Sequence, residues 1–230
     1  LFRLSSGKGA SAQLWKPTLE RLDLVVGPDG DVKVPPTGID YYHLLVAKRD
    51  RGALRETALR YFHRYGRPGG HSPAELTAAK KARLEIVPAP LPREHQQYLG
   101  GGPSARFTIR YAGVPLADAD ITLTTSNGTV ASFQSDRNGT AQVTLPDDFK
   151  QVKAGRGRNP PAEFVMRVKH QEGAQRYVTT LSGAYHVNPS HWQSTTEGVW
   201  IVIAGFVTGL AAVGVRRRHH APDAKGGRRG

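Results

Sequence analysis

Histidine is the residue type in this chain best able to hold a metal ion. The sequence has nine histidines and no cysteine, which excludes disulfides, thiolate metal sites and a cysteine nucleophile. Imidazole together with carboxylate suits nickel, copper or zinc, and His43, His63 and His71 all fall in the N-terminal half. No histidine pair has the i, i+4 spacing around an acid that marks a helical metal motif. A metal site built from these three residues is therefore one hypothesis, and structural or exposed histidines are the other.

Catalytic motifs are missing from the sequence. It contains no G-x-S-x-G elbow, no phosphate-binding glycine loop and no His-Glu-x-x-His. The paired acids Asp147 and Asp148 could do acid-base chemistry, but they follow Leu145-Pro146 at the end of an expected strand, where a solvated turn is more typical. We therefore expect no catalytic residues, no enzymatic activity and no cofactor, with a divalent metal such as nickel as the alternative.

A long uncharged run near the C-terminus predicts a membrane anchor. Residues 199–215 carry no charge and are followed at once by Arg216, Arg217 and Arg218. A spanning helix needs about 20 mostly apolar residues, so we expect one transmembrane helix over 197–217. The arginines predict a basic cytoplasmic tail over 218–230 and an exterior placement for everything before the span. A buried core helix is the alternative, but such helices rarely lack polar positions on every face.

Small residues form one face of this predicted helix. Gly205 and Gly209 make a G-x-x-x-G motif, with Ala212 on the adjoining face. Such residues let a second helix approach closely, so we expect other integral membrane subunits as partners through this helix. Chance is the alternative, because glycine is common in membrane helices.

The charge balance also bears on partners. The formal net charge is +13, of which the tail from Arg216 onward contributes +5, leaving +8 outside the membrane. This excess favours anionic lipid headgroups or an acidic partner. An extracytoplasmic location argues against nucleic acid. The chain opens at Leu1 without a basic segment followed by an apolar one, so we expect the printed sequence to begin partway along the protein.

The N-terminal region, residues 1–100, is predicted to hold a hairpin and two helices. A turn at 27–30 separates extended stretches at 22–26 and 31–34. Apolar residues recur at helical spacing between 51 and 65, which predicts a helix there. A capping box of Ser72 and Glu75 predicts a second helix that runs through Leu84, and the prolines that follow predict an extended linker.

Beyond residue 100 the pattern changes to period two. Residues 101–190 are expected to form an antiparallel β-sandwich, because six or seven short alternating stretches are separated by turn residues. Asn127-Gly128 predicts a type I′ hairpin turn. The alternating stretches lie at 105–111, 119–125, 130–133, 140–145, 162–168 and 176–181.

Some of these stretches carry a family resemblance. Gly113-Val-Pro-Leu116, the stretch 119–123, Asp136-Arg-Asn-Gly139 and Leu145-Pro146 resemble the periplasmic transthyretin-like or immunoglobulin-like domain of proteins linked to nickel and cobalt uptake. In physical terms, Gly113 makes a corner, Asp136 accepts backbone N–H groups and Gly139 takes a positive φ. The resemblance covers about 94–186 and the C-terminal anchor.

Together these features predict a non-enzymatic accessory or structural subunit. It would be a single-pass protein of the bacterial inner membrane, with its N-terminal domain in the periplasm and its C-terminus in the cytoplasm. The resemblance implies the alternative, a metal-handling component of nickel or cobalt uptake.

Overall fold

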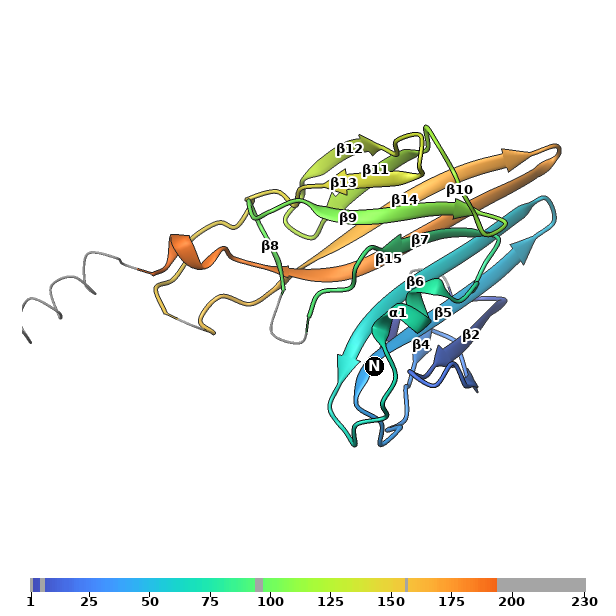
Figure 1. Cartoon of the computed structure of the whole chain (residues 1–230), viewed down its shortest axis with the longest axis horizontal. Helices are drawn as coiled ribbons and strands as arrows, with labels where there is room; N and C mark the ends of the chain where they lie inside the picture. The colour runs from blue at the N-terminus through green and yellow to red at the C-terminus, as the bar shows by residue number, and fades with distance from the viewer. Residues whose placement is uncertain (1, 5–6, 94–96, 156, 194–230) are drawn as a thin grey trace, which may run out of the picture.

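The computed structural model of this chain is mainly β and describes residues 2–4, 7–93, 97–155 and 157–193 (Figure 1). The predicted membrane helix over 197–217 and the tail over 218–230 lie outside the described residues. No helix within the described ranges has the length and apolar character needed to cross a membrane.

One large sheet runs the length of the molecule. Its strand order is β12-β11-β14-β15-β6-β5-β2-β3, with β8 beside the far half of β15. Neighbouring strands within 101–190 are antiparallel, as predicted, but β15 runs parallel to both β6 and β8, which precede residue 101. The strands are β2 (Ala10–Trp15), β3 (Arg21–Leu24), β5 (Tyr41–Arg51), β6 (Leu54–Arg64), β8 (Tyr98–Leu99), β11 (Asp120–Thr125), β12 (Val130–Gln134), β14 (Ala162–Glu172) and β15 (Gln175–His186).

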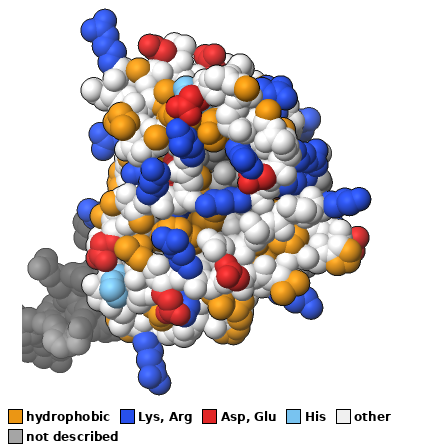
Figure 2. Space-filling model, turned by 90° about the vertical axis from the view of Figure 1, so that its right-hand side faces the viewer, with side chains coloured by type: hydrophobic (Ala, Val, Ile, Leu, Met, Phe, Trp, Pro, Cys, Tyr) orange, Lys and Arg blue, Asp and Glu red, His pale blue; other side chains and the backbone are white. Residues whose placement is uncertain are grey.

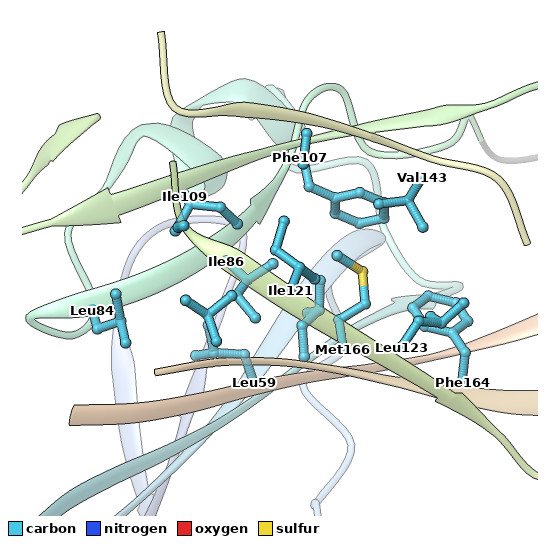
Figure 3. Close-up of a cluster of buried hydrophobic side chains, with 14 of the residues drawn as sticks. Leu59, Leu84, Ile86, Phe107, Ile109, Ile121, Leu123, Val143, Phe164 and Met166 are labelled. Carbon is cyan, nitrogen blue, oxygen red and sulfur yellow. The ribbon is translucent and has the colours of Figure 1, made fainter. Parts of the chain in front are cut away.

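A smaller sheet packs over one face of the large one. In it β9 (Ala105–Tyr111) pairs with β7 (Leu84–Pro88), β10 (Val114–Pro115) and β13 (Thr140–Val143). The main core lies between the two sheets, where side chains from both layers meet (Figure 3). Ile86, Phe107 and Ile109 from the small sheet are at most 1% exposed, as are Leu123 and Met166 from the large sheet.

The N-terminal segment covers part of the opposite face of the large sheet. Here β1 (Phe2–Arg3) pairs with β4 (Asp31–Val32), and both lie over β2, β5 and β6. A second apolar cluster forms beneath them, with Leu45 and Ala47 of β5 buried in it. The strands β5 and β6 are thus covered on both faces.

This double cover explains why the helix predicted over 51–65 is wrong. The segment is strand β6, paired along its whole length with β5. Leu59 and Tyr61 face the main core, while Ala58 and Phe62 face the second cluster. A strand buried on both faces loses the clean period of two, and its apolar residues then imitate helical spacing.

The second predicted helix is shorter than expected. The capping box of Ser72 and Glu75 is present, but α1 spans only Pro73–Ala78. Leu84, predicted as its end, instead begins strand β7 inside the core. The chain turns in between, because the Glu85 carboxylate accepts the backbone N–H groups of Lys81 (2.8 Å) and Ala82 (3.3 Å).

Buried charges fix α1 to the small sheet. The ammonium of Lys81 donates to the carbonyls of Leu76 (3.0 Å) and Thr77 (3.1 Å), which are among the last carbonyls of α1. It also lies 3.8 Å from Glu85, whose other carboxylate oxygen is 3.1 Å from Arg110. The Lys81 and Glu85 side chains are fully buried, and burial lowers the pKa of Lys81 to about 8.

Two turns also depart from prediction. The turn at 27–30 forms, but the strands on either side of it do not pair as the predicted hairpin. Instead β3 pairs with β2 and β4 pairs with β1, and Val26 and Val32 form an isolated bridge across the turn. At Asn127-Gly128 only the glycine has a positive φ, of 97°, so the turn is not of type I′. The backbone N–H of Gly128 donates to the carbonyl of Thr125, and the N–H of Thr125 donates to the carbonyl of Thr129. This pattern belongs to a longer hairpin connection, in which one glycine in the αL conformation follows the turn.

The period-two stretches beyond residue 100 are confirmed as strands. The turn before β13 forms as expected: Asp136 accepts the N–H groups of Asn138 and Thr140 at 2.8 Å, and Gly139 has φ 67°. Strands from both sides of residue 100 share the large sheet. The division into regions 1–100 and 101–190 stays a prediction.

Candidate functional site

The structure does not bring His43, His63 and His71 together. His43 and His63 lie on neighbouring strands, but their pairing partners are Phe62 and Tyr42, so the two imidazoles are on opposite faces of the sheet. His71 precedes α1 and contacts Glu75 at 3.3 Å. Across the described ranges, no three His, Cys, Asp or Glu side chains are grouped so that they could hold a metal ion.

The surroundings of His43 give both of its ring nitrogens a partner. Nδ1 lies 3.0 Å from the carbonyl of Tyr41, and Nε2 lies 2.7 Å from the hydroxyl of Thr37. Because a carbonyl only accepts, Nδ1 carries the proton and Nε2 accepts from the threonine. Burial lowers the pKa of His43, which favours this neutral form. His43 is therefore a satisfied core histidine.

His63 lies among tyrosine rings. Its imidazole is 5.9 Å from Tyr41, 5.5 Å from Tyr42 and 5.0 Å from Tyr65, measured between ring centroids. Both of its ring nitrogens are buried, and no described residue forms a hydrogen bond with them. Packing among rings explains this residue better than metal ligation does, since none of its neighbours supplies a second ligand of the usual kind.

The other predicted site residues fall outside the described residues. These are the proposed helix-contact residues Gly205, Gly209 and Ala212 and the topology determinants Arg216, Arg217 and Arg218.

A polar network instead marks the end of the molecule from which the chain runs on toward residue 194. The hydroxyl of Tyr185 donates to Asp148 at 2.5 Å, and the same carboxylate accepts from Thr125 (2.7 Å) and Asn127 (3.1 Å). Burial by itself would raise the pKa of Asp148, but these hydrogen bonds outweigh it and lower that pKa. The network ties β15, the end of β11 and the loop after β13 into one unit.

A pocket of about 370 Å³ opens beside this network. Its walls come from the loop 149–161, the turn at Ser126 and Asn127, and Val187 just after β15. Among the described residues, Lys150, Lys153 and Arg158 line it together with the acidic Asp148. The pocket is thus basic, and it lies against the segment that leads out of the described domain.

A larger groove, of about 530 Å³, lies beside the N-terminal segment on the face of the large sheet away from the small sheet. Small side chains of β5, β6, β14 and β15 line its floor, and the N-terminal strand β1 forms one wall. Two ion pairs between strands line it, Arg60 with Glu163 at 3.0 Å and Arg49 with Glu56 at 2.7 Å. The Arg49–Glu56 pair joins the neighbouring strands β5 and β6, whereas the Arg60–Glu163 pair reaches from β6 across β15 to β14. Both pairs tie strands of the sheet together, which is a structural role.

The opposite end of the molecule carries the tips of the β5–β6 and β14–β15 hairpins. Figure 2 views this end, where Lys and Arg side chains are spread over the surface with acidic side chains among them. The charge of Arg83 at this end is balanced by Glu172, which lies 2.8 Å from it. Arg83 also donates to the hydroxyl of Tyr111 at 2.7 Å.

Comparison of the chain with known protein families and with curated proteins finds no match. Sequence reasoning placed Asp148 in a solvated turn and did not single out Tyr185, because a contact between residues so far apart in the chain leaves no local pattern. The basic, glycine-rich stretch of loop 149–161 was the only visible sign of the pocket.

Proposed function

We propose that this protein is a non-enzymatic, single-pass subunit of a larger bacterial inner-membrane complex. Its exterior part would be an immunoglobulin-like or transthyretin-like β-sandwich in the periplasm, followed by the membrane helix 197–217 and the cytoplasmic tail 218–230. The observation that supports this proposal most strongly is the uncharged run 199–215, which three arginines follow directly. Its small-residue face supports contact with partner helices.

The form of the described domain supports this proposal. The described residues reach Gln193, and five residues lie between it and the uncharged run. Five extended residues reach about 18 Å at most, which would hold the domain close to the bilayer surface. The Tyr185 network would then brace the end of the domain that faces the membrane.

The test begins with isolated membranes from cells that express the full chain. We expect the protein to stay in the membrane fraction after alkaline washing and to co-purify with other membrane proteins after gentle solubilisation. Release by the alkaline wash would contradict the anchor. Recovery only as a lone monomer would contradict the subunit role.

Topology supplies a second arm of this test. Protease added outside the inner membrane should digest the chain before Gly198 and spare a tag placed after Arg229. Neutral residues at Arg216, Arg217 and Arg218 should weaken this orientation. A tag that is cut in the unmodified protein would overturn the assignment.

A further inference from the structure

We propose that the pocket beside loop 149–161 binds the phosphate of an anionic lipid headgroup. This inference rests on the proposed membrane anchoring and goes beyond it, because it assigns a ligand to particular residues.

Three cations without acidic partners point to an anion. Lys150, Lys153 and Arg158 line the pocket, and within the described ranges none of them forms an ion pair. A phosphate diester offers oxygens for an arginine fork and for lysine ammonium groups, so it suits such a set.

The loop that carries these cations is held in shape by an amide side chain. Asn159 accepts from the backbone N–H of Lys153 at 2.8 Å and donates to the carbonyl of the same residue at 2.7 Å. This two-way contact closes the loop between 153 and 159 and keeps Lys153 near Arg158. The backbone that carries Lys153 and Arg158 is thus closed before a ligand arrives, which lowers the entropy lost on ordering this loop.

The acidic group in the pocket is directed elsewhere. Asp148 accepts hydrogen bonds from Tyr185, Thr125 and Asn127, and it pairs with none of the three cations. Its negative charge remains, so the pocket is less basic than its cations alone suggest. With Asp148 counted, the lining charge is still positive.

The position of the pocket favours a lipid over a soluble ligand. Val187 lines it, and the chain continues from there through Gln193 to the uncharged run. The five residues between Gln193 and the uncharged run reach about 18 Å at most, and Val187 lies six residues before Gln193. Attraction to an anionic surface fades beyond a Debye length of about 8 Å, so basic residues at this end gain most from headgroups.

The experiment places the full chain in nanodiscs and follows hydrogen exchange of its backbone amides. One set of discs contains only phosphatidylcholine, and the other contains phosphatidylglycerol in addition. We expect exchange in peptides covering 149–159 to slow at least about threefold with phosphatidylglycerol, which is within the roughly fivefold effect of one basic residue near an anionic surface. Exchange in β14 should not change.

A charge-matched pair of variants tests the residues. The triple variant Lys150→Gln, Lys153→Gln, Arg158→Gln should lose the protection by phosphatidylglycerol. The control triple variant neutralises exposed cations toward the hairpin tips, at Lys48, Lys169 and Arg176, and should keep it. Unchanged exchange in β14 and β15 verifies that each variant is folded.

The outcomes separate this inference from the proposed function. Equal exchange in both kinds of disc, or protection that survives the first triple variant, overturns the headgroup site while the anchor stands. Protection by inorganic phosphate in phosphatidylcholine discs overturns the lipid assignment in favour of a soluble anion. A chain that leaves the discs on alkaline washing overturns the anchor and this inference with it.

Discussion

The hydroxyl of Tyr185 donates a hydrogen bond of 2.5 Å to the carboxylate of Asp148. Tyr185 is on the last strand of the domain and is fully buried, whereas Asp148 is on the loop after β13. Asn127 reaches both groups, donating to Asp148 at 3.1 Å and to the Tyr185 hydroxyl at 3.2 Å. These hydrogen bonds together join three separate segments at the end of the domain nearest the predicted anchor.

Removing this hydroxyl should destabilise the domain. Tyr185→Phe keeps the ring in the core but deprives Asp148 of its shortest donor, and we expect the free energy of unfolding to fall by about 2 kcal/mol, the usual range for a bond to a charged group. Urea unfolding of the full chain in detergent measures the change. Tyr65→Phe is the control, since Tyr65 is 79% exposed. Equal stability of the two variants would contradict a role for the bond.

The same network should make the free energy of unfolding depend on pH in the acidic range. Hydrogen bonds lower the pKa of Asp148 below that of an unfolded aspartate, which is about 3.9. Below about pH 4 the unfolded state takes up the proton more readily, so this contribution is lost as pH falls through the folded pKa. The stability gap between the wild type and Asp148→Asn should therefore narrow on acidification. A gap that is constant from pH 6 to pH 3 would count against this account.

Lys81 should affect the free energy of unfolding in the alkaline range of pH, whereas Asp148 affects it in the acidic range. Burial lowers the pKa of Lys81 to about 8, against about 10.4 in the unfolded chain. Between these values the unfolded state holds a proton that the folded state releases, so stability contributed here rises with pH. We expect wild type to gain stability over Lys81→Met when urea unfolding is repeated at pH 10 instead of pH 7.5. Parallel pH profiles would show that Lys81 stays charged in the fold.

Gly183 should tolerate no larger side chain. A Cβ atom there would lie 2.6 Å from the ring of Phe164, its partner on β14. Overpacking of this kind costs about 1–3 kcal/mol, so Gly183→Ala should lower the urea midpoint by a corresponding amount. Ser182→Ala is the neighbouring control. In a double-mutant cycle, Phe164→Leu should relieve part of the penalty, and strict additivity would rule out the clash.

The predicted membrane helix offers a test of partner contact. Gly209→Leu places a bulky side chain on the small-residue face, so we expect normal insertion but loss of co-purifying membrane proteins. Phe206→Leu, on a different face, should leave association nearly unchanged. If both variants retain their partners equally, the G-x-x-x-G pattern is incidental.

The sequence predicted best those strands that have one buried and one exposed face. Along β9, Phe107 and Ile109 are buried while Arg106 is exposed, and period-two alternation finds such a strand directly. It fails for β6, whose two faces are both covered. It also fails for β7, where all five residues are buried and the prolines that follow indicate a linker.

The candidate site was less predictable than the fold. The basic residues of loop 149–161 are visible in the sequence, but the pocket depends on Val187 and on the Asn159 contact, which only the folded chain reveals. The structure keeps the three histidines apart for a related reason. Alternation along paired strands put His43 and His63 on opposite faces, and strand pairing was not predicted there.

The parallel pairing of β6 with β15 has a consequence for biosynthesis. The ladder joins Leu54 to Arg176, so β6 has no partner on that edge until nearly the whole domain has been made. At typical synthesis rates this interval is roughly ten seconds. An unpaired edge is a template for intermolecular pairing, so the nascent N-terminal half needs shielding until its last strand arrives. We therefore expect any chaperone that assists this protein to bind the β5–β6 hairpin while the chain is still being synthesised.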